Sequence, residues 1–146
     1  GISGLAASPA VGPGARQLAH YIASATGQAV WLADESLMDA VTAVSGSGPA
    51  YFYLLMEHME RAAIDLGLPP DLAAALTRET ALGAARVVIE TKADPGRLRA
   101  AVTSPGGTTA AALRVFEAAG LEAIVREALA AARDRSAELG RVTPGK

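Results

Sequence analysis

Cysteine is absent from the 146 residues of this chain. Its absence excludes disulfide bridges, thiolate nucleophiles and metal sites built on cysteine. Long apolar runs are lacking as well, and none approaches the ~18 residues that a membrane-spanning helix needs. The first residues, Gly1–Gly4, carry no charged side chain and do not resemble a signal peptide. We therefore expect a cytoplasmic protein with no membrane partner.

Aromatic residues and charge of one sign are both scarce. The chain has two Phe, three Tyr and one Trp, and its 13 basic and 15 acidic residues leave a net charge of −2. No basic run is longer than a pair, which argues against a nucleic-acid partner and against a polybasic membrane patch. Hydrophobic residues make up 51% of the chain, and alanine, the best helix former, supplies many of them. The composition therefore favours packed helices over a β-sandwich.

The first 34 residues follow a strand–helix–strand pattern. Ile2–Ala6 and Ala29–Leu32 are apolar and suit short strands, and Gly14–Thr26 between them has a helical apolar face. Two strands alone do not form a stable sheet, so further strands are expected to pair with them. We therefore interpret residues 1–34 as a fragment of an α/β domain, whose further strands are expected to lie upstream of this segment.

From Asp34 onward the pattern is helical, and we assign residues 35–141 to one helical-bundle domain and residues 142–146 to a flexible tail. The apolar helix faces are long for so small a core. A second copy of the chain is the partner favoured to cover them, and a monomeric bundle is the alternative. Helices are predicted over about Ser36–Val44, Ala50–Leu66, Asp71–Thr91, a short segment ending near Val102, Thr108–Gly120 and a last helix ending at Gly140.

A first glycine-rich break, Ser45–Pro49, interrupts this pattern with the residues Ser-Gly-Ser-Gly-Pro. Its two glycines cost roughly 2 kcal/mol of helix stability relative to alanine, and Pro49 cannot donate to the preceding turn. One interpretation is a kink or turn between two helices. The other is a close approach of the backbone to a ligand, which only glycine permits. The local residues leave both interpretations open.

A second break, Thr103–Thr109, has the residues Thr-Ser-Pro-Gly-Gly-Thr-Thr. Pro105 and the two glycines after it force a tight turn, and Thr108 and Thr109 then open a helix. The free backbone N–H groups of a helix N-terminus, together with the helix dipole, make a site for an anion such as a carboxylate. An ordinary capped helix start is the alternative, and the local residues do not exclude it.

Taken together, two long segments resemble the signature of pyrroline-5-carboxylate reductases. These are Asp39–Tyr51, with the residues DAVTAVSGSGPAY, and Val102–Thr109, with the residues VTSPGGTT. The interval between the segments and the preceding Glu35–Met38 also fit, and the similarity extends from Gly1 to about Gly140. The family reduces the cyclic imine of 1-pyrroline-5-carboxylate to L-proline, the last step of proline biosynthesis, with NADPH or NADH as cofactor.

The resemblance implies an N-terminal Rossmann domain followed by a mainly α C-terminal domain, a helical bundle similar to the C-terminal domain of 6-phosphogluconate dehydrogenase. Two such domains interlock into a homodimer, and dimers can assemble further into rings. Residues 1–34 would then be the trailing edge of the Rossmann domain. The family's glycine-rich dinucleotide loop lies before this segment and nothing here replaces it, so we expect the chain by itself to be inactive.

The resemblance also implies site residues, and none of them is a metal ligand. Thr109 would be catalytic, with its hydroxyl nearest the ring nitrogen of the substrate. The substrate-binding residues would be Ser104, Pro105, Gly106, Gly107, Thr108 and Thr109. The residues near the nicotinamide would be Ser45, Gly46, Ser47, Gly48 and Pro49.

The sequence is compatible with two other functions. The chain could be a non-catalytic helical oligomerisation module that keeps the fold without the chemistry. It could also be the helical domain of a β-hydroxyacid or phosphogluconate dehydrogenase, but those families usually carry a catalytic lysine on the first long helix, and Ser36–Leu66 contains none. The acidic pair Glu35 and Asp39 is interpreted as an ordinary complement of the helix dipole. His20 and His58 are solitary and are interpreted as surface or structural residues.

Overall fold

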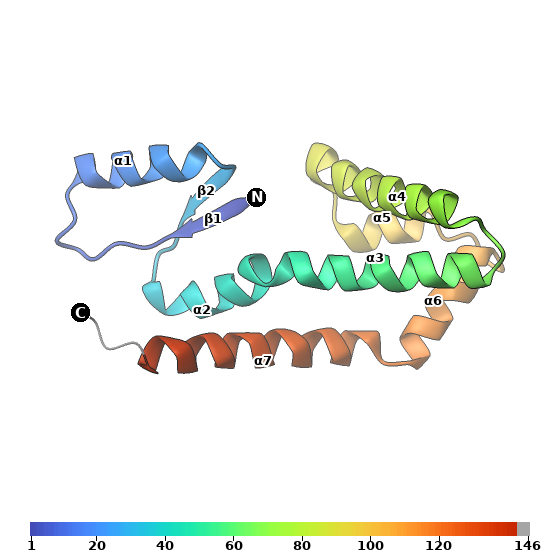
Figure 1. Ribbon diagram of the computed structural model, residues 1–146. Coiled ribbons are helices and arrows are strands. Elements are labelled where there is room, and N and C mark those ends of the chain that lie inside the picture. Colours follow the sequence, from blue (N-terminus) through green and yellow to red (C-terminus); the bar gives the residue numbers. More distant parts are fainter. Residues whose placement is uncertain (143–146) are drawn as a thin grey trace. The chain divides into compact units, whose positions relative to one another are not determined.

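The computed structural model describes residues 1–142 (Figure 1). They form two compact units, one from Gly1–Pro49 and the chain from Ile124 onward, the other from Ala50–Ala123. The chain is mainly helical with a short parallel sheet at its N-terminus, which confirms the predicted fold class. The predicted tail, residues 142–146, lies outside the described residues except for Val142, where the last helix ends. No described helix is long and apolar enough to cross a membrane.

The first unit begins with the predicted strand–helix–strand segment. Strands β1 (Ile2–Leu5) and β2 (Gln28–Trp31) pair in parallel, with Leu5 opposite Trp31. Helix α1 (Pro13–Ser24) connects the strands and contacts both. A parallel pair needs such a crossover because its second strand must start again at the same edge as the first.

An arginine holds the loop between β1 and α1. The guanidinium group of Arg16 lies over the ring of Trp31, 5.4 Å from its centroid. The same group donates hydrogen bonds to the carbonyl oxygens of Ala7, Ser8 and Val11 at 3.3 to 3.4 Å. A cation on an aromatic face is attracted by the ring's quadrupole, so this side chain fastens the loop to the sheet.

The helical part of the first unit begins with a single 3₁₀ turn, η1 (Glu35–Leu37). The carboxylate of Asp34 caps this turn by accepting a hydrogen bond from the backbone N–H of Ser36 at 2.8 Å. Because the bond stabilises the ionised carboxylate, it lowers the pKa of Asp34. The cap sets the point at which the chain leaves β2 and becomes helical.

Helix α2 (Met38–Val41) continues directly into a π-helix, η2 (Thr42–Gly46). Strand β1 passes close to α2, because a Cβ atom added to Gly4 would lie 2.8 Å from Cγ1 of Val41. Real Cβ atoms do not approach another atom so closely, and the valine side chain is short and stiff. Glycine is therefore required at this position of the strand.

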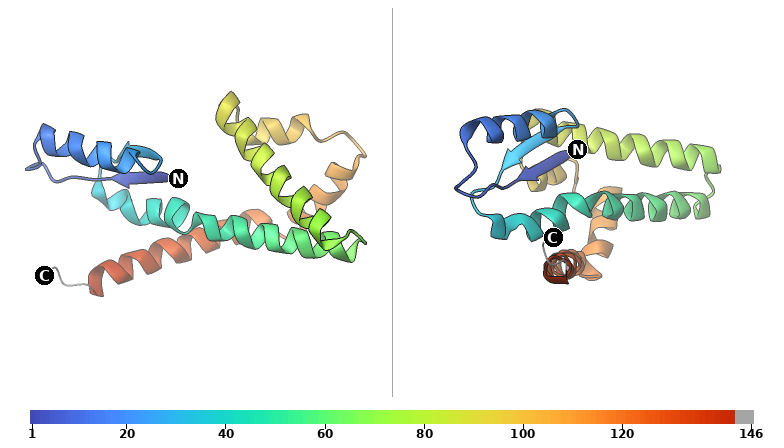
Figure 2. Two further views of the ribbon diagram at one scale, coloured as in Figure 1. Left: turned by 45° about the horizontal axis from the view of Figure 1, so that its top comes forward. Right: turned by 60° about the vertical axis from the view of Figure 1, so that its left-hand side comes forward.

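The second unit is an arrangement of helices in which α3 and α4 form a hairpin that opens like a V (Figure 2, left). The turn of the hairpin is a Schellman motif, in which Gly67 N–H donates to Ile64 and Leu68 N–H donates to Ala63, at 2.8 and 3.1 Å. The helices are α3 (Gly48–Asp65), α4 (Pro70–Thr91), α5 (Pro95–Ala101), α6 (Thr108–Ala118) and the start of α7 (Leu121–Val142).

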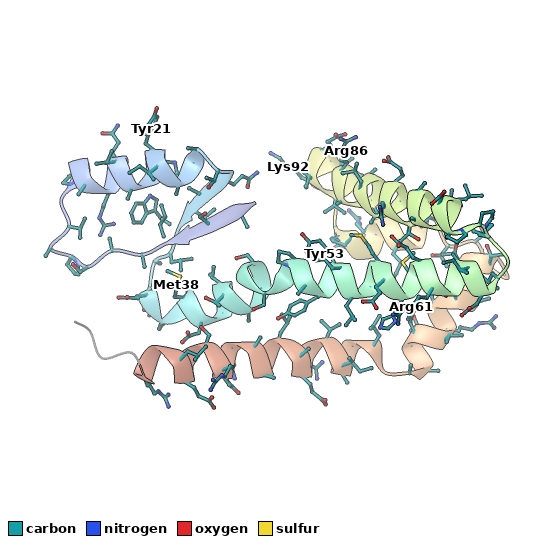
Figure 3. All side chains as sticks on the ribbon, viewed as in Figure 1. Tyr21, Met38, Tyr53, Arg61, Arg86 and Lys92 are labelled. Carbon is teal, nitrogen blue, oxygen red and sulfur yellow. The ribbon has the colours of Figure 1, made fainter. Side chains whose placement is uncertain are left out.

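Small residues form the most buried part of both units. Ala43 on η2 is 1% exposed, and Ala73 on α4 is 0% exposed with Thr77 one turn further along. Small side chains let helix backbones approach closely, but they bury little apolar area. Larger apolar residues remain at the surface: Tyr21 on α1 and Tyr53 on α3 extend away from their helices (Figure 3) and are 76% and 67% exposed.

Candidate functional site

The second glycine-rich break is a tight turn with the features of a type II β-turn. The carbonyl oxygen of Ser104 accepts a hydrogen bond from the N–H of Gly107 at 3.0 Å. Pro105 takes the second position, where its fixed φ is favourable, and Gly106 takes the third with φ +74°. Residues with a Cβ rarely adopt this left-handed conformation, so Gly106 is the residue that makes the turn possible.

Helix α6 begins directly after this turn, and Gly107 is its N-cap residue in an extended conformation. No side chain among the described residues caps the helix. The first intrahelical bond runs from the N–H of Ala111 to the carbonyl oxygen of Gly107 at 3.1 Å. The N–H groups of Thr108, Thr109 and Ala110 therefore have no acceptor within the helix, and they point outward at the positive end of the helix dipole.

The side chains around this helix start differ in exposure. Thr109, the second residue of α6, is half-buried, whereas Thr108 and Ser104 are exposed. A hollow of about 290 Å³ adjoins the same turn, and Gly106 is the predicted site residue that lines it. The hollow thus lies beside the predicted substrate cradle and does not coincide with it. Its lining is Thr103, Gly106, Ala110, Leu113, Arg114 and Glu117.

The first glycine-rich break is not a turn but the end of the π-helix and the start of α3. The N–H of Ser47 donates to the carbonyl oxygen of Thr42, five residues earlier, at 2.8 Å. The hydroxyl of Ser45 donates to the carbonyl oxygen of Val41 at 2.9 Å. Pro49 has no N–H for Ser45, four residues earlier, so the α-helical pattern cannot continue through the segment. Widening into a π-helix keeps the chain helical in spite of this proline.

An apolar groove of about 420 Å³ lies beside this π-helix, within the first unit. One wall comes from the two strands and the other from η1, α2 and η2. Ser45, which is half-buried, contributes the hydroxyl group of the lining. The lining residues are Ile2, Gly4, Val30, Leu32, Leu37, Ala40, Val41, Val44 and Ser45.

The two predicted parts of the site belong to different units. Ser45–Pro49 belongs to the first unit and Ser104–Thr109 to the second. Within each segment the predicted site residues lie next to one another in the structure. A single cleft that contains both segments stays a prediction. Among the described residues, no group of three His, Asp or Glu side chains could hold a metal ion.

One interaction near the site was missed by the sequence reasoning. Asp39, interpreted as a complement of the helix dipole, accepts a hydrogen bond from the hydroxyl of Ser136 on α7 at 2.6 Å. The two residues are 97 positions apart, and no periodicity or motif connects them. Only the packing of α7 in the first unit could reveal this pair.

Comparison with protein families identifies the class of protein to which the chain belongs. Residues 35–139 match the family model described as pyrroline-5-carboxylate reductase dimerisation. This segment contains the helices that follow the two strands, up to Leu139 of α7, including the π-helix and the turn at Ser104–Gly107. The helical part of the chain therefore has the fold of this dimerisation domain, and the chain belongs to the pyrroline-5-carboxylate reductase family.

Individual relatives agree with this assignment. The chain is 52% identical over 139 residues to the pyrroline-5-carboxylate reductase of Pseudomonas aeruginosa, covering 95% of this chain and 51% of that protein. The solved reductase structure from Coxiella burnetii has a TM-score of 0.89 at 43% identity, covering 94% of this chain and 51% of that one. The structure from Plasmodium falciparum, with NADP bound, has a TM-score of 0.85 at 30% identity, covering 91% and 50%. The chain thus spans about half the length of these relatives.

Proposed function

We propose that this chain is the C-terminal part of a cytoplasmic enzyme that reduces 1-pyrroline-5-carboxylate to L-proline with NADPH or NADH. In this proposal residues 1–34 end a dinucleotide-binding domain and residues 35–141 form the substrate-binding and dimerisation domain. The observation that carries it is the turn at Ser104–Gly107 followed by a helix start without a side-chain cap. Family membership supports the same conclusion.

The substrate carboxylate would bind at the N-terminus of α6. The N–H groups of Thr108, Thr109 and Ala110 have no intrahelical acceptor, and the helix dipole favours a negative charge at this end. The exposed hydroxyl of Ser104 can donate one further hydrogen bond. Gly107 already donates its N–H to Ser104, so its part in the cradle would be to shape the backbone.

Thr109 would act on the ring nitrogen of the substrate. The dinucleotide supplies a hydride to the imine carbon, and the protein must mainly orient the two rings. Electron density rises at the nitrogen as the imine becomes an amine, so a hydroxyl donor there is more strongly bound in the transition state than in the ground state. The half-buried position of Thr109 supports this role because partial burial of the residue limits competition from water. The proton of the nitrogen comes from solvent, or the substrate binds already protonated.

The Ser45–Pro49 segment would lie near the nicotinamide ring. Its half-buried Ser45 and Ser47, the exposed backbone of Gly46 and the adjoining apolar groove suit a flat, uncharged ring that carries an amide group. The segment has no cationic side chain for the phosphates of the dinucleotide. We expect other parts of the complete enzyme to bind these phosphates, and we expect this chain alone to bind the dinucleotide weakly.

The same proposal makes the chain a homodimer, with dimers able to assemble into rings. Phe52 on α3 is 64% exposed, and Leu72 and Leu76 on α4 are about half exposed, which is costly for a chain in water without a partner. The family description as a dimerisation domain supports a second copy as the partner. This apolar surface also favours the second candidate function, an oligomerisation module without catalysis.

Titration with the reaction product separates the two candidates. L-proline carries the carboxylate that the cradle should recognise, and pyrrolidine is the matched ring without it. We expect L-proline at millimolar concentration to shift the NMR amide resonances of Thr108, Thr109 and Ala110, whereas pyrrolidine leaves them unchanged. A dimeric chain whose amides respond to neither compound, or to both equally, would support the oligomerisation module and contradict the carboxylate site.

A further inference from the structure

A hydrogen bond between distant parts of the sequence lies one turn before the π-helix. The hydroxyl of Ser136 on α7 donates to Oδ1 of Asp39 on α2 at 2.6 Å. Both side chains are half-buried. Hydrogen bonds to a carboxylate are short and roughly twice as strong as those between neutral groups, and partial burial limits competition from water.

The position of Asp39 makes this bond important for the segment that follows. Helix α2 has four residues, too few to be stable by itself, and η2 begins three residues after Asp39. Four residues after Asp39, Ala43 is 1% exposed, so this part of the chain is held against its neighbours. A tether at Asp39 therefore restrains the start of the π-helix.

A π-helix needs such support from outside itself. Its geometry is rare and less favourable than that of an α-helix, and it persists where the surrounding structure holds it. Pro49 prevents the regular α-helical bond to Ser45, but it does not select the bond from Ser47 to Thr42 among the remaining possibilities. Tertiary contacts must make that selection, and the Asp39–Ser136 bond is one such contact, a side-chain hydrogen bond from α7 to this region.

We propose that Ser136 and Asp39 are a positioning pair that holds the π-helix, and through it Ser45–Pro49, in the conformation that receives the nicotinamide. The cofactor part of this inference rests on the proposed function. Neither residue of the pair lines the groove or belongs to the predicted cradle, so both act through the backbone of Ser45–Pro49. Helix α7 thereby contributes to the cofactor side of the site without touching the ligand.

Hydrogen exchange on the chain tests the structural half of the proposal. Ser136→Ala removes the donor, and we expect the Ser47 amide to exchange at least about tenfold faster because the π-helix opens more often. Amides in the middle of α4 should keep their rates. Ser136→Thr retains a hydroxyl and should restore protection at Ser47. Ser24→Ala is the matched control, since Ser24 is exposed at the end of α1. An unchanged rate at Ser47, or equal acceleration throughout the chain, would overturn the proposal.

Kinetics of the complete reductase test the other half. We expect Ser136→Ala to raise KM for the dinucleotide by about tenfold while KM for the imine changes little, with Ser136→Thr close to the wild type. A variant whose exchange accelerates at Ser47 but whose KM for the dinucleotide is normal would limit the pair to stabilising the helix and overturn its positioning role. Failure of the proposed function would give a different result from failure of the positioning role, because the unaltered complete protein would then lack reductase activity.

Discussion

The change of Thr109 to alanine in the complete enzyme separates a catalytic hydroxyl from a helix-capping one. Thr109 is the second residue of α6, and the cap position before the helix belongs to Gly107. No side chain among the described residues forms a cap bond there, so Thr109→Ala removes no cap. A catalytic hydroxyl and a helix-capping hydroxyl at Thr109 therefore predict different effects of this change on kcat and on stability.

The expected magnitudes follow from these two roles. Loss of one hydrogen bond to the reacting nitrogen should cost about 1–3 kcal/mol of transition-state stabilisation, a kcat lower by roughly five- to 150-fold. The free energy of unfolding should change by less than about 0.5 kcal/mol, because alanine is the better helix former and its smaller side chain loses only part of a half-buried contact. Thr109→Ser keeps the hydroxyl and should retain most of the activity.

Steady-state kinetics and urea denaturation on the same preparations provide the assay. Thr80→Ala is the matched control, because Thr80 is exposed in the interior of α4. We expect Thr80→Ala to leave both kcat and the urea midpoint near the wild-type values. A Thr109→Ala enzyme with normal kcat would refute the catalytic role, and a lowered urea midpoint in that enzyme would show that the hydroxyl serves the helix after all.

Three further predictions concern close packing, the turn and the assembly. Gly4→Ala should lower the free energy of unfolding by about 1–3 kcal/mol in urea titrations because its Cβ overlaps Val41, and the added change Val41→Ala should restore most of the loss. Gly106→Ala should lower the free energy of unfolding by about 1–2 kcal/mol because alanine is strained at this left-handed φ. Gly83→Ala, in open space within α4, should raise the free energy of unfolding by about 0.5–1 kcal/mol. Equal effects of the two changes would contradict the turn argument. Sedimentation velocity at micromolar concentration should give at least a dimer, and a monomer mass would count against the proposed assembly.

The ends of the helices were largely predictable because the signals that set them are local. Gly67 closes α3, and the helix predicted from Asp71 begins one residue earlier, at Pro70, with Pro69 as its N-cap residue. Pro105, Gly106 and Gly107 form the expected turn, and α6 starts at Thr108. Glycine and proline act through the φ angles and N–H groups of their own residues, so no distant contact is needed to interpret them. The roles of the site residues in binding and catalysis stay predictions.

The π-helix was not predictable to the same extent. The residues of Ser45–Pro49 indicated an interruption, and both a kink and a ligand-driven approach were left open. The structure has a helical path with one wider segment, Thr42–Gly46, and the approach of this backbone to a ligand stays a prediction. The proline explains why the α-helical pattern fails, but the bond that replaces it depends on what the segment packs against.

The sequence by itself determined the order of the long helices and most of their ends, the strand–helix–strand segment and the family to which the chain belongs. The tertiary structure alone decided that Ala43 and Ala73 would be the most buried apolar residues and that Asp39 would bond to Ser136. The physical reason is the range of the interactions. Helix periodicity and turn chemistry act within a few residues, whereas burial and the 97-residue contact exist only after the chain has folded.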